Sequence, residues 1–204
     1  MTTQPAFRRS EPDARRLSLI EACARVLARA GIAGASVRTI AVEAGVSAGL
    51  VGHYFAGVDA LIAATYAHTG ARVDTALEAA VATAGEDPRA RLEAFVTASF
   101  ASPIADPELL ATWIAFWSLV RARPEIAALH DEQYGGFRGQ LERLLADCGL
   151  PAAQLRTMAI AITALVDGLW LELCLSPREL TATEAAAIAR DALARLTSPV
   201  KATG

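Results

Sequence analysis

The chain has 204 residues, of which 53% are hydrophobic and 20% charged, so it can form a sizeable core and is not intrinsically disordered. Its formal net charge of −3 does not by itself indicate a nucleic-acid partner. The charge is uneven, however: residues 1–60 carry seven Arg against five acidic residues, while the rest of the chain is acidic, a weak indication that the N-terminal part contacts phosphate.

The sequence predicts an all-α protein of about nine helices, because apolar residues recur at three- and four-residue spacings and no β-type alternation is sustained. Gly31 is expected to end the first helix, and Asp106 followed by Pro107 to begin a later one. The first 11 residues are expected to be flexible and the tail from Thr197 to be frayed. The helices are expected near residues 12–30, 37–44, 48–54, 58–82, 89–101, 107–120, 124–148, 151–175 and 183–196.

Residues 36–55, SVRTIAVEAGVSAGLVGHYF, have the layout of a helix-turn-helix DNA-binding motif. Two short helices are joined by a turn containing Gly45, which permits a positive φ angle. The second helix would lie in a major groove with its N-terminal residues against base edges. Ser47 and the neighbouring backbone N–H groups would meet phosphate at the positive end of that helix.

The run IAVEAGVSAGLVGHYF resembles the signature of the TetR family of transcriptional regulators, in which an Ile-Ala pair, Ala-Gly-Val-Ser and a closing His-Tyr-Phe are typical. The resemblance implies a DNA-binding domain over residues 1–57 and a ligand-binding and dimerisation domain over residues 58–204. It also implies a homodimer, joined through the last two long helices, that binds a near-palindromic operator in double-stranded DNA. The residues that it indicates for DNA binding are Arg38, Thr39, Ser47, Ala48, Gly49, Leu50, Gly52, His53 and Tyr54.

The motif departs from the family pattern at three positions. Val58 stands where the family usually has Lys, Gly52 where many members have Tyr, and Leu50 where many have Thr. This recognition helix therefore offers few bidentate hydrogen bonds to bases, and the operator sequence does not follow from it. An alternative stays open, in which the chain binds a small molecule and its head no longer binds DNA. Ordinary solvent exposure is the alternative interpretation for His53 and Arg38.

Two C-terminal segments, TWIAFWSL at residues 112–119 and ALVDGLWLELCLS at residues 164–176, resemble the choline-responsive BetI branch of that family. Helical spacing places Trp113 and Trp117 on one face, with Phe116 beside them.

A second face, on a later helix, carries Asp167 and Trp170, three residues apart. If the two faces meet, aromatic rings and one carboxylate would line a cavity that suits an organic cation through cation–π attraction. Tyr134 is a weaker candidate for the same cavity, as is His130. Ordinary core packing remains the alternative for the aromatic residues, and a hydrogen bond between helices or subunits the alternative for Asp167.

The sequence therefore predicts a ligand-released repressor; choline, betaine aldehyde, a polyamine and an uncharged aromatic compound all remain open as effectors. No catalytic triad or phosphate-binding loop is present, so we expect no enzyme activity and no cofactor. The three cysteines are odd in number and far apart, which argues against a disulfide framework or a metal site. No apolar run approaches the ~20 residues of a membrane span, and no signal peptide is expected, so we expect a cytoplasmic protein without a membrane partner.

Overall fold

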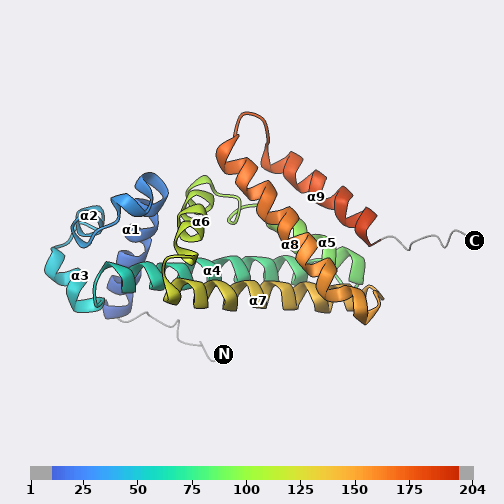
Figure 1. The fold of residues 1–204 in the computed structure, drawn as a ribbon, viewed down its shortest axis with the longest axis horizontal. Coiled ribbons are helices and arrows are strands. Elements are labelled where there is room, and N and C mark those ends of the chain that lie inside the picture. The colour runs from blue at the N-terminus through green and yellow to red at the C-terminus, as the bar shows by residue number, and fades with distance from the viewer. Residues whose placement is uncertain (1–10, 198–204) are drawn as a thin grey trace, which may run out of the picture.

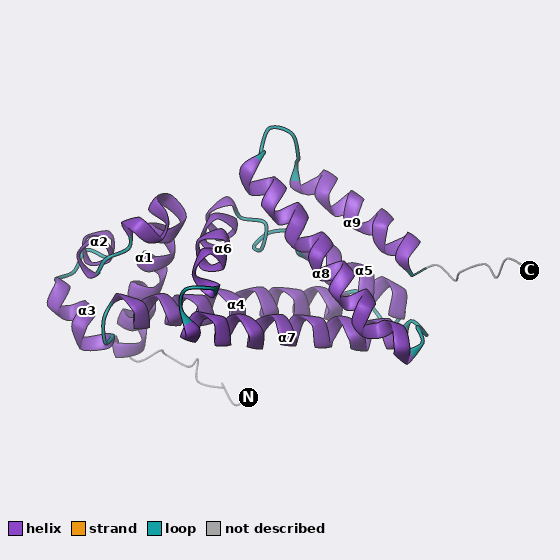
Figure 2. Ribbon diagram, in the orientation of Figure 1, coloured by secondary structure: helices purple, strands orange, loops and turns teal. Residues whose placement is uncertain are grey.

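The computed structural model describes residues 11–197, and these residues form nine α-helices and no strand (Figure 2). The predicted flexible arm and frayed tail lie outside the described residues, apart from Glu11, with which the first helix begins, and Thr197. The helices are α1 (Glu11–Gly34), α2 (Val37–Glu43), α3 (Ala48–Tyr54), α4 (Val58–Thr83), α5 (Pro88–Ala98), α6 (Pro107–Val120), α7 (Pro124–Asp147), α8 (Ala152–Leu175) and α9 (Ala182–Leu196).

Helices α1, α2 and α3 form a head at one end of the molecule (Figure 1). The side chain of Ser36 accepts a hydrogen bond from the backbone N–H of Thr39 at 3.1 Å, so it caps α2. Gly45 has a φ of 66° in the turn that follows, which only glycine adopts without strain. Helix α1 is longer than predicted: Gly31 interrupts it with a φ of 58°, and a further turn reaches Gly34.

The body of the molecule is a bundle in which α4 and α7 run side by side and α8 crosses them (Figure 1). Helix α5 packs against α4, α7 and α9. It ends at Ala98, three residues earlier than predicted, and begins at Pro88, whose preceding residue Asp87 caps it by accepting from the N–H of Ala90 at 3.0 Å. The core between these helices is apolar, with Leu77, Leu141 and Ile162 at 0–1% exposure.

Helix α6 joins the body to the head. It packs along α1 as well as against α7 and α8. The hydroxyl of Thr112 on α6 donates to the carbonyl oxygen of Ala24 on α1 at 3.1 Å. At the other end of α6, Arg123 pairs with Asp59 in the first turn of α4. Helix α6 is therefore in direct contact with the head through α1.

Helix α8 carries more apolar side chains than are buried within the single chain. By length and composition alone it could cross a membrane, although Arg156, Asp167 and Glu172 interrupt its apolar runs. Core helices of soluble proteins pass the same test, but most of α8 is not buried in the protomer. Large apolar side chains remain exposed on α8 and α9, namely Ile160, Leu171, Leu175, Ile188 and Leu196.

Candidate DNA interface and effector pocket

The recognition helix α3 is held on the head by two buried side chains. Val51 is fully buried, and Phe55, directly after the helix, is packed in the core with the guanidinium of Arg16 lying 5.0 Å from its ring centroid. The side chain of Ser47 caps α3 by accepting from the N–H of Leu50 at 3.3 Å. The opposite side of α3 is thereby left facing solvent.

That outward side contains most of the residues predicted to contact DNA. Leu50 and Tyr54 are half-buried, and the ring of Tyr54 meets that of His53 edge to face at 5.2 Å. Val58, where the family usually has Lys, is half-buried against the core. The exposed members of the predicted set are Arg38, Thr39, Ser47, Ala48, Gly49, Gly52 and His53.

Helix α2 is fixed to α1 by a pair of arginines that the sequence analysis did not single out. Arg25 and Arg29 donate to the two carboxylate oxygens of Glu43 at 2.8 and 2.9 Å. These hydrogen bonds hold the pKa of Glu43 below its ordinary value, and the bond from Arg25 has the largest effect. Two of the seven arginines of the N-terminal region are thus engaged within the head, so the excess of positive charge available to phosphate is smaller than the sequence suggested.

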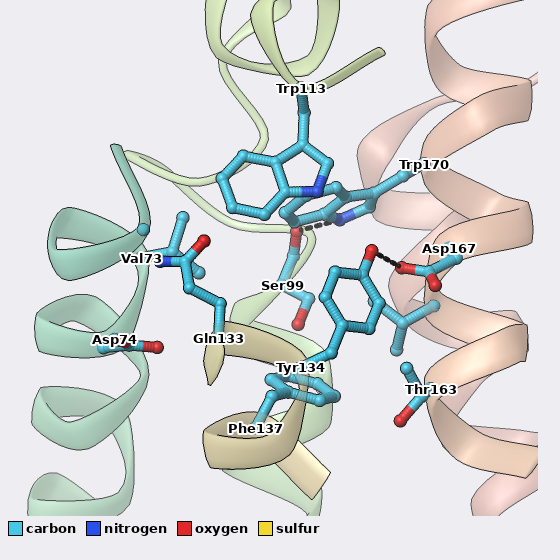
Figure 3. Close-up of a pocket in the computed structure, with 12 residues that line it drawn as sticks. Val73, Asp74, Ser99, Trp113, Gln133, Tyr134, Phe137, Thr163, Asp167 and Trp170 are labelled. Carbon is cyan, nitrogen blue, oxygen red and sulfur yellow. Dashed lines mark hydrogen bonds between the residues drawn. The ribbon is translucent and has the colours of Figure 1, made fainter. Parts of the chain in front are cut away.

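A pocket lies in the body, enclosed by α4, α6, α7 and α8 and by Ser99 after α5 (Figure 3). The cavity itself has a volume of only about 40 Å³, and the surrounding space, open solvent included, is about 450 Å³. Trp113 is only 5% exposed, and its ring meets that of Trp170 edge to face at 5.9 Å. The lining residues are Gly70, Val73, Asp74, Ser99, Trp113, Gln133, Tyr134, Phe137, Thr163, Val166, Asp167 and Trp170.

Asp167 is the acidic end of a hydrogen-bonded chain in this pocket. The indole N–H of Trp117 donates to the hydroxyl of Tyr134 at 3.0 Å, and that hydroxyl donates to Oδ1 of Asp167, also at 3.0 Å. Burial raises the pKa of Asp167 from 3.8 to about 6, although the Tyr134 hydrogen bond and the charge of Arg138 act in the opposite direction. Burial, followed by the charge of Asp167, also raises the pKa of Tyr134. Asp167 is thus a desolvated carboxylate that accepts one hydrogen bond, from a neutral hydroxyl, and is also stabilised by the charge of Arg138.

The predicted pocket residues fall into two groups. Trp113, Tyr134, Asp167 and Trp170 line the pocket together (Figure 3). Trp117 does not line it but supports Tyr134 from behind.

The remaining candidates pack beside the pocket rather than in it. Phe116 is fully buried, with its ring centroid 4.6 Å from that of Tyr66. His130 stacks on Tyr134 at 4.1 Å, and its Nδ1 lies 3.2 Å from the hydroxyl of Tyr66. Burial is the main cause that lowers the pKa of His130.

The sequence analysis did not predict the pocket residues on α4, or Gln133 on α7. Gly70, Val73 and Asp74 share one face of α4 by their spacing of three and four residues. Gln133 reaches across from α7 so closely that a Cβ atom at Gly70 would lie 1.0 Å from its Nε2. Helical spacing could have grouped these residues, but nothing in the sequence indicates that their faces meet.

No group of three His, Cys, Asp or Glu side chains that could hold a metal ion occurs within residues 11–197. The chemistry available in the pocket is therefore that of two indole rings, a phenol, an amide and the carboxylates of Asp74 and Asp167.

Two family models match the chain. Residues 19–65 match that of bacterial regulatory proteins of the tetR family, and residues 88–198 match that of the BetI-type transcriptional repressor C-terminal domain. Curated relatives named HTH-type transcriptional regulator BetI are 34% identical. The one from Paraburkholderia phytofirmans aligns over 87% of this chain and 90% of its own length. The one from Burkholderia mallei aligns over 91% and 94%.

Solved structures agree with this assignment. A crystal structure of a transcriptional regulator from Pseudomonas aeruginosa PAO1 is 40% identical, with a TM-score of 0.83 and coverage of 93% of both chains. A regulator from Saccharomonospora viridis, solved in complex with choline, shares the fold at 20% identity, with a TM-score of 0.73 and coverage of 89% of this chain and 95% of its own. The chain described here belongs to the TetR family of transcriptional regulators, in the branch that has a BetI-type C-terminal domain.

Proposed function

We propose that this regulator is a cytoplasmic repressor that binds a near-palindromic operator as a homodimer and is released when an organic cation such as choline enters the pocket. The observation that carries the proposal is the desolvated carboxylate of Asp167 beside the rings of Trp113 and Trp170. Within the described residues no Lys, Arg or His lies within ion-pairing distance of it. A buried carboxylate of this kind favours a bound cation, and indole rings add cation–π attraction.

The names of relatives support the same effector class. The curated homologues are BetI regulators, and the Saccharomonospora viridis protein of the same fold was crystallised with choline. Neither observation assigns a ligand to this chain, and the pocket chemistry supplies the independent argument.

Helix α6 offers a route by which the ligand would act on the head. Trp113 lines the pocket, while the adjacent Thr112 bonds to the backbone of α1. A ligand that favours one position of Trp113 would bias α6 between two positions and so change the separation of the two heads in the dimer. Release then requires only that the ligand bind the DNA-incompetent arrangement more tightly than the competent one.

The second subunit would cover the apolar side of α8 and α9. Leu175 is 67% exposed in the protomer and Ile188 is 45% exposed, and both would be buried in an interface between two copies. This interface accounts for the apolar character of α8 without a membrane partner. A two-fold dimer also presents two recognition helices to successive turns of DNA.

Calorimetric titration of the dimer with choline tests the effector class. Wild-type protein is expected to bind choline, and Asp167→Asn to lose at least about tenfold in affinity, because the charge that attracts the cation is gone. Asp131→Asn is the matched control: the same chemical change on α7, outside the pocket lining. If choline, tetramethylammonium and a polyamine all fail to bind wild-type protein, the cation proposal is wrong.

Electrophoretic mobility shift with the protein's own upstream DNA tests the DNA-binding part. The dimer is expected to bind this DNA more tightly than random duplex, and choline to release it. Equal affinity for both duplexes would favour the alternative, a ligand-binding protein with an inactive head. Gly52 is exposed with no atom near its added Cβ position, so Gly52→Tyr together with Val58→Lys should then create DNA affinity that the native chain lacks.

A further inference from the structure

The effector pocket is small for the occupant proposed above. Its volume of about 40 Å³ compares with roughly 30 Å³ for one water molecule in the liquid. An organic cation of several heavy atoms therefore needs more room than the side chains leave. Protein interiors are close-packed, so this room has to come from a side chain that moves into space outside the core.

The mouth of the pocket lies between α4 and α7. Among the described residues that line the pocket, Asp74 on α4 is exposed, and the others are buried or half-buried. Phe137 on α7 is one of the half-buried residues. In Figure 3, Asp74 and Phe137 both lie at the end of the pocket away from Trp113. A ligand that enters at this mouth therefore meets the ring of Phe137.

A second hollow, here called the outer hollow, lies on the surface between α4, α5 and α7. It has a volume of about 200 Å³, and its lining includes the exposed residues Glu78 and Gly136. Asp74 and Phe137 line both the outer hollow and the pocket. These two side chains therefore separate a small inner cavity from a larger space that is open to solvent.

Phe137 has free space beside it on its own helix. Its ring packs on that of Phe95 on α5, with the centroids 5.0 Å apart and 36° between the ring planes. Gly135 and Gly136 precede Phe137 on α7, and a Cβ atom added to either would meet no atom within 4 Å. A change of side-chain rotamer can therefore carry the ring toward the outer hollow without breaking backbone hydrogen bonds of α7.

We infer that Phe137 is the gate of the effector pocket: its ring moves into the outer hollow when a ligand enters and stays there while the ligand is bound. The inner cavity then gains the volume that the ring occupied, while Trp113, Asp167 and Trp170 keep their places around it. Gly136 has a specific role in this movement, because a larger side chain there would fill the space that receives the ring.

Acrylamide quenching of tryptophan fluorescence in the intact protein tests the gate without any effector. Trp113 and Trp170 line the pocket and are 5% and 6% exposed, so a small neutral quencher has to enter the pocket to reach them. Trp117 does not line the pocket and contributes the same background to each variant. Phe137→Ala should raise the quenching constant at least about twofold, because it leaves the mouth open.

Gly136→Leu should have the opposite effect and lower the quenching constant at least about twofold, because it fills the outer hollow. Gly135→Leu is the matched control: the same substitution at the neighbouring exposed position, outside the lining of both spaces. Both substitutions raise helix propensity by the same amount, so a difference between them does not come from helix stability. Equal quenching in the wild type and both leucine variants would overturn the gate, whether or not Phe137→Ala folds.

Calorimetric titration with choline extends the test to the effector, and this part rests on the proposed function. Gly136→Leu should bind choline at least about tenfold more weakly than the wild type, because the ring has no space to move into, and Gly135→Leu should bind it as the wild type does. Equal choline affinity in Gly136→Leu and the wild type would refute the gate and leave the cation pocket standing. If choline does not bind the wild type while quenching follows the expected order, the proposed effector class fails and the gate stands.

Discussion

At the scale of single residues, Asp167 is the group whose environment has most to do with function. Its carboxylate is desolvated between α7 and α8 and accepts one hydrogen bond, from Tyr134. Burial disfavours the charged form, so the folded protein holds the proton of this group more tightly than the unfolded chain does. A cation bound beside it would reverse that preference, because it favours the ionised carboxylate.

The affinity for choline is therefore expected to depend on pH through Asp167. Its pKa is raised from 3.8 to about 6, so between those values the folded state binds more protons and stability falls as the pH rises. Choline affinity runs the other way and should be about tenfold weaker at pH 5 than at pH 7. Calorimetric titrations with choline at pH values between 5 and 7 measure this change in affinity.

Other titratable groups lie near the pocket, so a control is needed to assign the pH dependence of choline affinity to Asp167. Burial raises the pKa of Asp74 and lowers that of His130. If Asp167 is responsible, the residual binding of Asp167→Asn should not vary between pH 5 and 7. A profile that keeps the wild-type shape in this variant would assign the titration to another group.

Tyr134→Phe probes the hydrogen-bonded chain at the same scale. The hydroxyl is buried and joins Trp117 to Asp167, so its removal leaves both without their partner. We expect a loss of about 1–3 kcal/mol in the free energy of unfolding, measured by urea denaturation. Tyr54→Phe removes a hydroxyl from a half-exposed ring and should change stability little. Equal effects of the two substitutions on the free energy of unfolding would argue against a stabilising role for the hydrogen bonds of Tyr134.

At the scale of secondary structure elements, α7 is notable for glycines next to the pocket wall. Gly135, Gly136 and Gly139 lie in the same stretch of the helix as the pocket residues Gln133, Tyr134 and Phe137. Glycine lowers helix stability because the unfolded chain gains freedom and no side chain packs. The part of α7 that lines the pocket therefore has the lowest intrinsic helix propensity in that helix.

Gly136→Ala should stabilise the protein. An added Cβ at this helical position meets no atom within 4 Å, so no steric cost offsets the gain in helix propensity. We expect the free energy of unfolding to rise by roughly 0.5–1 kcal/mol in thermal or urea unfolding. Gly45→Ala provides the contrast, because its φ of 66° disfavours any side chain even though space is available. An increase in stability for both would contradict the reasoning.

At the scale of the whole molecule, α1 of the head packs on α6, α6 packs on α8, and α8 packs on α9 (Figure 1). The head contacts the body through α1 with α6 and α4. Most of the exposed large apolar side chains of the described residues lie on α8 and α9, the two helices furthest from the recognition helix along the chain, and the other, Val42, lies on α2. In a dimer joined through α8 and α9, the position of α6 in each subunit would set the distance between two heads.

Ile160→Arg combined with Ile188→Arg should disrupt the dimer. Both side chains are exposed apolar groups in the protomer, one on α8 and one on α9, and the paired charges would be buried without partners in the interface. We expect monomers in light scattering and at least about a tenfold loss of operator affinity, because one head replaces two. Ala79→Arg, on the exposed side of α4, should remain dimeric. Dimers that persist in the double variant would place the interface elsewhere.

The local features of this protein were predictable from sequence. Ser36, Gly45 and Ser47 determine the caps and turn of the head through interactions within a few residues, so the helix-turn-helix followed from its motif. The same holds for most helix ends, since capping is local. The long α8 was also predicted as a helix, from the apolar residues that recur along it.

The pocket was only partly predictable, because spacing along one helix says which residues share a face but not what that face meets. The sequence left open whether the faces of Trp113 and Asp167 meet, and both line the pocket, whereas Phe116, between Trp113 and Trp117 in sequence, packs in the core. Which ring faces the cavity depends on the rotation of α6 against α7 and α8. Gln133 could be placed in the pocket lining only from the packing of α7 against α4, which puts its amide beside Gly70. The sequence by itself determined the family, the head and the helices, because those depend on short-range interactions; the tertiary structure decided the composition of the pocket, because that depends on how four helices pack.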